Sequence, residues 1–287
     1  MVDAERASEG GIPVSAGHSS GNGDLLSVDG LSVSFGAVKA VDEVAFEVGH
    51  GELFAVIGPN GAGKTTILNC LSGLCRPNAG SIRFDGRELA GRPPEQIATA
   101  GVGRTFQNIE LFEALSVLDN LLLGRHARMG YGPLRSLVFS PRARREERRH
   151  RRRVEEIIDF LELEAYRQQP VASLAYGVQK RVELGRALAS EPRLLLLDEP
   201  VAGMNREETE DMARYILDVQ ESLDVTIVLI DHHMGLVMDL ADRILVVDFG
   251  QPVALGTPAQ IQSNPDVIRV YMGGERSSAT ADSTQEG

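Results

Sequence analysis

The stretch that decides the fold of this chain reads Gly58-Pro59-Asn60-Gly61-Ala62-Gly63-Lys64-Thr65-Thr66. It fits the G-x-x-x-x-G-K-[ST] pattern of a phosphate-binding loop. The apolar run 53–57 in front of it predicts a strand buried on both faces, and apolar residues at helical spacing behind it predict a helix. Glycines let the backbone approach a ligand closely, and a helix N-terminus favours an anion. This order therefore predicts a polyphosphate site.

Two side chains of the loop carry the expected chemistry. Lys64 would contact the β- and γ-phosphates of a nucleotide, and the Thr65 hydroxyl would bind Mg²⁺. The alternative for the whole stretch is a glycine-rich turn in front of a core helix, without a ligand. The predicted order of strand, loop and helix favours the nucleotide site.

The chain has 287 residues and a formal net charge of −12. This length suits one large domain or two small ones, and the acidic balance argues against nucleic acid as a ligand. No stretch approaches the roughly 20 apolar residues of a membrane span, and the N-terminus lacks the apolar core of a signal peptide, so we expect a cytoplasmic chain. Cys70 and Cys75 are expected to be small buried side chains on the helix after the loop.

The remaining sequence alternates between strand and helix patterns. Strands are predicted near residues 26–35, 43–48, 53–57, 81–84, 194–197, 225–230 and 243–247. Helical segments join the last three, which predicts right-handed crossovers and a mainly parallel sheet. The predicted fold class is α/β: a P-loop NTPase core with an N-terminal antiparallel β subdomain and a helical insertion.

The domain organisation follows from the same patterns. Residues 110–185 have no convincing strand pattern and are predicted to form the helical subdomain. Residues 1–24 and 274–287 contain few large apolar side chains and are predicted to be disordered, which leaves 25–273 as the ordered domain. Near the end, Thr257-Pro258-Ala259-Gln260 fits a capping box, and Asn264-Pro265 predicts another helix start.

Two carboxylates end the apolar run 194–197. Ligands of parallel sheets bind at the carboxyl ends of strands, so Asp198 is expected to hold Mg²⁺. Glu199 comes one residue later and faces differently, and we expect it to polarise the attacking water as a general base. The alternative is a solvated acidic turn, which the phosphate-binding loop upstream disfavours.

The segment Ser173-Leu174-Ala175-Tyr176-Gly177-Val178-Gln179-Lys180-Arg181 precedes a predicted helix and offers another anion-binding turn. With the loop and the acidic strand in this order, the chain resembles the ATP-binding subunits of ABC transporters. The family signature reads L-S-G-G-Q, and three of its five positions differ here. The L-A-Y-G form resembles the subfamily of branched-chain amino acid importers. Ala175 lacks the hydroxyl that the family offers to the γ-phosphate. Val178 stands where the family has glutamine, and the neighbouring Gln179 either takes over part of that role or has no part in it.

The resemblance implies roles for further residues. Gln107, in Gly103-Arg104-Thr105-Phe106-Gln107, would approach the Mg²⁺ and the attacking water, and its segment, the Q-loop, would relay movement to membrane subunits. His232 fits the switch histidine that contacts the γ-phosphate. Phe35 fits the aromatic residue that stacks on adenine. The alternatives are a surface amide for Gln107, a structural histidine for His232 and a core phenylalanine for Phe35.

Two positions depart from the family pattern close to these residues. Ala202-Gly203-Met204-Asn205 occupies the D-loop, where the family has aspartate in place of Asn205, although the importer subfamily resembles this chain there. His233 also stands where an aspartate is usual, and it receives no predicted role. The L-A-Y-G segment, Arg104-Thr105-Phe106-Gln107-Asn108 and the ending 256–271 carry the resemblance to the importer subfamily.

The resemblance implies an ATP-hydrolysing subunit of an importer for branched-chain or related amino acids, with ATP and Mg²⁺ as cofactors. Two such domains would sandwich two ATP molecules head to tail, so that Leu174, Ala175, Tyr176 and Gly177 contact the partner's nucleotide. The expected partners are two transmembrane permease subunits and a second ATP-binding subunit, in a heterodimer or alternatively a homodimer. An external solute-binding protein would take part indirectly, and nucleic acid would not. The chain would lie peripherally on the cytoplasmic face of the cell membrane.

Other classes of function remain as alternatives. The first is an ABC transporter for another solute, which includes an exporter. The second is a non-transport ABC ATPase, and the third is a nucleotide-binding regulator. Arginines crowd residues 142–153, which predicts a solvated helix leading into apolar positions, or alternatively contact with anionic lipid headgroups. A nucleic-acid patch is least favoured, because the chain is acidic overall.

Overall fold

The computed structural model describes residues 24–105, 110–125 and 141–271, without the side chains of 141–144 and 146. Gln107 lies outside the described residues. So do the segments predicted to be disordered, apart from Asp24. None of the helices in the described ranges is long and apolar enough to cross a membrane.

The main sheet has six strands in the order β10-β9-β3-β8-β7-β6. Their bounds are β3 (Leu53–Ile57), β6 (Val102–Arg104), β7 (Leu194–Asp198), β8 (Thr226–Ile230), β9 (Arg243–Asp248) and β10 (Gln251–Gly256). All neighbours pair in parallel except β10, which runs antiparallel to β9. The prediction of a mainly parallel sheet is confirmed.

Strand β3 is buried on both faces, as its apolar run predicts. Side chains alternate along a strand, so Leu53 and Ile57 enter one hydrophobic core while Phe54 and Val56 enter the other. The first core holds most of the helices, and the second joins the main sheet to the antiparallel sheet. The loop after β3 therefore starts from a fixed point between two cores.

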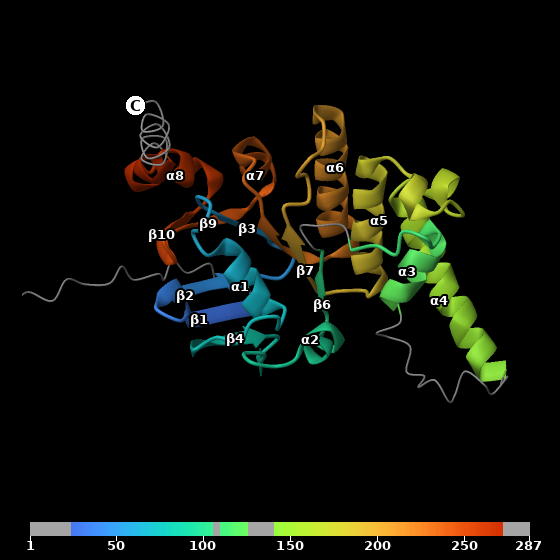
Figure 1. Ribbon diagram of the computed structural model, residues 1–287, viewed down its shortest axis with the longest axis horizontal. Helices are drawn as coiled ribbons and strands as arrows, with labels where there is room; N and C mark the ends of the chain where they lie inside the picture. Colours follow the sequence, from blue (N-terminus) through green and yellow to red (C-terminus); the bar gives the residue numbers. More distant parts are fainter. Residues whose placement is uncertain (1–23, 106–109, 126–140, 272–287) are drawn as a thin grey trace, which may run out of the picture.

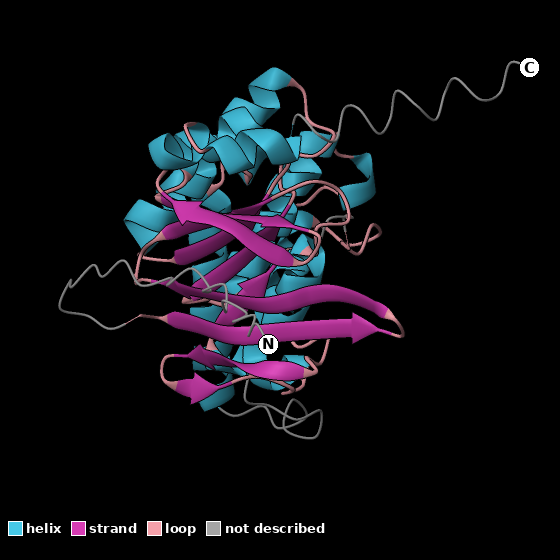
Figure 2. Cartoon of the chain, turned by 90° about the vertical axis from the view of Figure 1, so that its left-hand side faces the viewer, coloured by secondary structure: helices cyan, strands magenta, loops and turns pink. Residues whose placement is uncertain are grey.

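The second sheet is antiparallel, with the order β2-β1-β4-β5, and Figure 2 shows its long strands beside the main sheet. Its strands are β1 (Leu26–Phe35), β2 (Val38–Val48), β4 (Ala79–Phe84) and β5 (Arg87–Glu88). The predicted antiparallel subdomain is confirmed. Strand β2 begins five residues earlier than predicted, because the β1–β2 hairpin extends past the core into solvent, where Val38 is exposed.

Helices cover both faces of the main sheet (Figure 1). The α-helices are α1 (Lys64–Leu71), α2 (Pro94–Ala100), α3 (Val117–Arg125), α4 (Pro141–Phe160), α5 (Tyr176–Ala189), α6 (Arg206–Leu223), α7 (Met234–Leu240) and α8 (Pro258–Gln262). Helices α3, α4 and α5 lie together at one end of the molecule, and the described part of residues 110–185 contains no named strand.

Some local predictions were wrong. Strands β6 and β10 were missed because β6 has only three residues, including a glycine and an arginine, and β10 is an edge strand that contains Pro252. Cys70 is buried on α1 as expected, but Cys75 lies beyond the end of that helix and is half-buried. Both predicted helix starts near the end are confirmed. The Thr257 N–H donates to Gln260, and the Asn264 side chain accepts from the Asp266 N–H.

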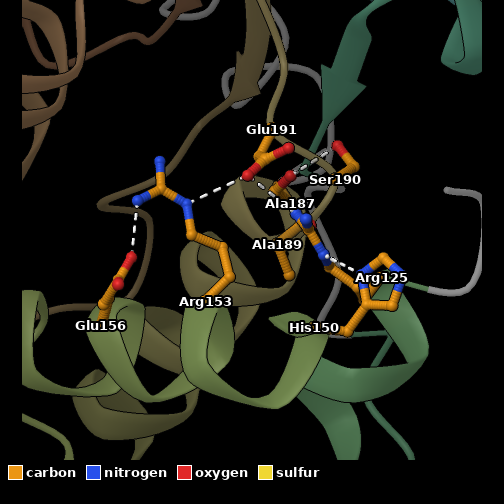
Figure 3. Close-up of polar contacts among 8 residues, drawn as sticks. All are labelled: Arg125, His150, Arg153, Glu156, Ala187, Ala189, Ser190 and Glu191. Atoms are coloured by element: carbon orange, nitrogen blue, oxygen red, sulfur yellow. Dashed lines mark hydrogen bonds and ion pairs between the residues drawn. The ribbon is translucent and has the colours of Figure 1, made fainter. Parts of the chain in front are cut away.

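The arginine-rich segment forms most of α4, which leads into buried apolar positions as predicted. One buried cation ties this helix to its neighbours (Figure 3). Arg125, at the end of α3, donates to His150 Nδ1 on α4 and to the Ala189 carbonyl oxygen, each over 2.9 Å. It also lies 3.1 Å from Glu191, which pairs with Arg153 of α4 over 3.0 Å. These contacts lock α3, α4 and the end of α5 together.

Replacing Arg125 should destabilise the protein. Arg125→Met leaves the buried Ala189 carbonyl oxygen without this donor, so we expect the free energy of unfolding to fall by about 2 kcal/mol. Urea denaturation followed by circular dichroism measures the change. Arg206→Met is the control, because Arg206 forms an ion pair with Glu210 in full solvent and should leave the midpoint unchanged. Equal midpoints for the two variants would contradict the importance of the buried contacts.

Candidate nucleotide site

The loop 58–63 follows β3 and bends where only glycine fits. Gly58 and Gly63 have φ values of 153° and 99°. A Cβ atom on Gly58 would lie 2.0 Å from the Val247 carbonyl oxygen, and one on Gly63 would lie 2.4 Å from the Ala40 carbonyl oxygen. Strands β9 and β2 thus confine the loop from two directions. This conformation depends on glycine, as the sequence of the loop predicts.

Lys64 is buried at the start of α1 and folds back over the loop. Its Nζ atom donates to the carbonyl oxygens of Gly58 and Pro59, over 2.7 Å and 2.9 Å. Burial lowers the pKa of Lys64, and the negative charges of Glu199 and Asp198 oppose this shift. Both predicted carboxylates are therefore close enough to act on the lysine.

Asp198 ends β7 and is buried, as a strand residue between two covered faces must be. Its Oδ2 atom accepts a hydrogen bond from Arg104 at the end of β6, over 3.0 Å. Burial raises the pKa of Asp198, and the charge and hydrogen bond of Arg104 oppose the shift. Sequence reasoning gave Arg104 no role in the site. The available signal was a charged residue within a short apolar stretch.

Glu199 leaves the direction of the strand, because its backbone has a φ of 49°. Its N–H donates to the Ile230 carbonyl oxygen over 2.7 Å, so the end of β8 fixes this turn. The side chain of His232 comes from the loop after β8, and its Nδ1 atom lies 3.5 Å from Glu199 Oε2. The His232 side chain is 61% exposed, which disfavours a buried structural histidine. Glu199 and His232 therefore lie together, as predicted.

Asp231 and His233 hold the backbone on either side of His232. Asp231 is fully buried, and its Oδ1 atom accepts from the His233 N–H over 2.8 Å. Burial raises the pKa of Asp231, and this hydrogen bond opposes the shift. His233 Nδ1 accepts from the Leu236 N–H over 3.3 Å and so caps α7. The structure thus gives His233 a role, since a side-chain acceptor is what a helix N-terminus needs.

The signature turn, residues 174–177, contacts the D-loop of the same chain. Tyr176 donates its hydroxyl hydrogen to the Ala202 carbonyl oxygen over 3.0 Å. Gly177 packs so closely against α6 that a Cβ atom there would meet Glu208 at 2.5 Å. The Ala202 N–H in turn donates to the Glu199 carbonyl oxygen over 3.2 Å. A short chain of contacts therefore runs from the signature turn to the predicted catalytic carboxylate.

The departures from the family pattern have local explanations in the fold. Ala175 precedes α5 as its N-cap residue, without a side-chain cap, and Val178 is buried in the core. The Gln179 side chain donates to the Leu174 carbonyl oxygen over 2.9 Å, which stabilises the turn. Asn205 caps α6 in a reciprocal pair with Glu208, so an amide serves where the family has a carboxylate.

Phe35 ends β1 at the tip of the β1–β2 hairpin, on the sheet that confines the loop through Ala40. Its side chain is 59% exposed. This exposure rules out the alternative of a core phenylalanine. Stacking on adenine stays a prediction.

The donor set suits a hard divalent cation on a nucleotide. The Thr65 hydroxyl and the Asp198 carboxylate are oxygen ligands of the kind that Mg²⁺ prefers. In the described ranges no group of three or more His, Cys, Asp or Glu side chains could hold a metal ion alone. Thr65 and Asp198 match the needs of Mg²⁺, which typically takes one or two protein ligands and completes its coordination with phosphate and water.

The sequence profile of the ABC transporter family matches residues 41–202, more than half of the chain. The chain belongs to the ABC transporter family. A profile named branched-chain amino acid ATP-binding cassette transporter also matches residues 251–277. The predicted resemblance to ATP-binding subunits of this family, and the ATPase class that goes with it, are confirmed. A subunit of such a transporter works with membrane-embedded partners.

Relatives and solved structures agree with this assignment. The high-affinity branched-chain amino acid transport ATP-binding protein BraF of Pseudomonas aeruginosa is 42% identical over 249 residues, which are 87% of this chain and 98% of BraF. LivG of Escherichia coli, which has the same descriptive name, is 43% identical with the same coverage.

Two cassettes of known structure confirm the fold. A nucleotide-free ATP-binding cassette from an ABC transporter has a TM-score of 0.75 at 29% identity and covers 86% of this chain and 98% of its own. An ABC cassette in its ADP conformation has a TM-score of 0.76 at 28% identity and covers 88% of this chain and 100% of its own. The predicted α/β P-loop NTPase class is thus confirmed.

The cap on α7 can be tested by substitution. His233→Ala removes the acceptor of the Leu236 N–H, so the free energy of unfolding should fall by about 1 kcal/mol. His233→Asn keeps an uncharged side-chain acceptor and should retain most of that stability. Urea denaturation of the three proteins decides the matter. Equal destabilisation by alanine and asparagine would contradict a capping role.

Proposed function

We propose that this chain hydrolyses ATP to drive an importer of branched-chain or related amino acids. The observation that carries the proposal is the grouping of Lys64, Asp198, Glu199 and His232 around the glycine loop. The solute rests on the names of the relatives and on the profile matched at the end of the chain. The ordered domain would span residues 25–273.

Each side chain has a proposed role that fits its place. ATP would displace Lys64 from the carbonyl oxygens of its own loop, so that its charge pairs with the phosphates. Bound Mg²⁺, held by Thr65 and Asp198, would neutralise charge on the phosphate oxygens. Glu199 would take a proton from the attacking water, and His232 beside it would contact the γ-phosphate. These groups act mainly by positioning and charge, with little covalent chemistry.

Other residues would complete the site from further away. Phe35 would stack on adenine, and Gln107 would approach the Mg²⁺ and the water. The turn 174–177 would face the nucleotide of a second ATP-binding subunit in a head-to-tail pair. Closure of the pair on ATP and its opening after hydrolysis would move two permease subunits between their two facings.

The assembly would lie on the cytoplasmic face of the cell membrane, with the chain bound peripherally. The second ATP-binding subunit would be a different chain, because the importer subfamily pairs two kinds. A solute-binding protein outside the membrane would deliver the amino acid to the permease. No part of this scheme involves nucleic acid, in keeping with the net charge of −12.

Substitution of Glu199 tests the hydrolytic step. Glu199→Gln removes the proton acceptor but keeps the size of the side chain, so turnover should fall by roughly 100-fold or more. Binding of a fluorescent ATP analogue should persist, because the glycine loop and Lys64 are intact. Glu221→Gln, an exposed change on α6, is the matched control and should leave turnover unchanged. Near-normal hydrolysis by Glu199→Gln would exclude Glu199 as the base.

Purification from native membranes tests the transporter assignment. The tagged Glu199→Gln variant, held closed with ATP, should bring down two polytopic membrane proteins and a second, similar ATPase from detergent extracts. Mass spectrometry identifies these proteins, and the untagged variant controls for background. Recovery of the chain alone, or with soluble partners only, would contradict the importer while leaving the ATPase intact.

A further inference from the structure

Arg104, at the end of β6, connects the strand that carries Asp198 to the helix that carries Thr65. Its Nη2 atom donates to Asp198 Oδ2 over 3.0 Å. Its Nη1 atom donates to Asn69 Oδ1 over 2.8 Å and to Ser72 Oγ over 2.6 Å. The side chains of Arg104 and Asp198 are only 9% and 3% exposed, so these contacts are made away from bulk water.

The two anchor points of Arg104 lie at the far end of α1 from the nucleotide loop. Asn69 is on the helix and Ser72 is its C-cap residue. The Ser72 hydroxyl donates to the Leu68 carbonyl oxygen over 2.9 Å, which orients its oxygen to accept from Arg104. Thr65 lies in the first turn of the same helix. Arg104 therefore fixes the position of Asp198 relative to the helix that presents the Thr65 hydroxyl.

We propose that Arg104 is a positioning residue for the Mg²⁺ that accompanies the nucleotide. It holds Oδ2 of Asp198 and leaves Oδ1 as the oxygen that can serve the metal. A planar guanidinium suits this task, because its separate N–H groups bond three acceptors in a fixed fork, which the single head of a lysine does not provide. The inference rests on the proposed Mg²⁺–nucleotide site and assigns to that site a residue from β6.

Outer contacts of this kind orient a metal ligand without touching the metal, and their loss typically lowers metal affinity by about 10- to 100-fold. The effect expected here is specific. Nucleotide binding without Mg²⁺ uses the loop and Lys64, whereas the three hydrogen bonds of Arg104 described above go to Asp198, Asn69 and Ser72. Binding with Mg²⁺ also uses Asp198, which Arg104 does contact.

The test compares the affinity for a fluorescent ATP analogue in excess EDTA and in excess Mg²⁺. In Arg104→Met, affinity in EDTA should equal that of the wild type, while the gain from Mg²⁺ should fall by about tenfold or more. Arg193→Met is the matched control. It removes an arginine from an exposed ion pair with Asp85, next to the opposite end of β7, and should keep the full gain.

A second variant guards against misfolding of the first. Asn69→Ala combined with Ser72→Ala removes the anchors on α1 without leaving a charge unpaired, and it should reduce the gain from Mg²⁺ in the same direction. An unchanged gain in this double variant, or in folded Arg104→Met, would overturn the inference. Equal losses with and without Mg²⁺ would also overturn it, because they would indicate a general structural role. Failure of the wild type to bind the analogue would instead overturn the proposed site itself.

Discussion

Two backbone carbonyl groups lie in close contact with the glycine loop and determine its conformation. The Val247 carbonyl oxygen meets Gly58 and the Ala40 carbonyl oxygen meets Gly63 at distances that exclude any side chain. One carbonyl belongs to the main sheet and the other to the antiparallel sheet. The loop therefore reaches its form only when both sheets have packed on their shared core, and the site depends on that packing.

The charges of the site are stabilised by one another. Lys64 is buried near Asp198 and Glu199, and Arg104 is buried against Asp198. Each group alone would be costly to bury, because desolvation disfavours its charged form. Together they form a compact set in which the pKa shifts caused by burial are opposed by neighbouring charges. Such a set is what the proposed binding of ATP with Mg²⁺ would require.

Patterns local in sequence predicted much of this molecule. The loop from Gly58 to Thr66 and the pair Asp198–Glu199 each follow a strand that could be identified from its own residues. The contacts of Arg104 and Asp231 could not be predicted, because they depend on the register of β6 with β7 and on how tightly the ends of β7 and β8 are buried. His233 was missed for another reason: capping by an imidazole nitrogen replaces the aspartate expected at that position.

The hydrogen bond between Tyr176 and Ala202 has a mechanical consequence. Ala202 is bonded to the Glu199 backbone, so the signature turn and the carboxylate turn belong to one linkage within the chain. In the proposed head-to-tail pair these two turns serve different nucleotides. A movement of the signature turn at one ATP would then displace the Glu199 turn at the other ATP. The connection runs through the Tyr176 hydroxyl and the backbone between Ala202 and Glu199. The two ATP molecules bound across such a pair would therefore be mechanically coupled to each other.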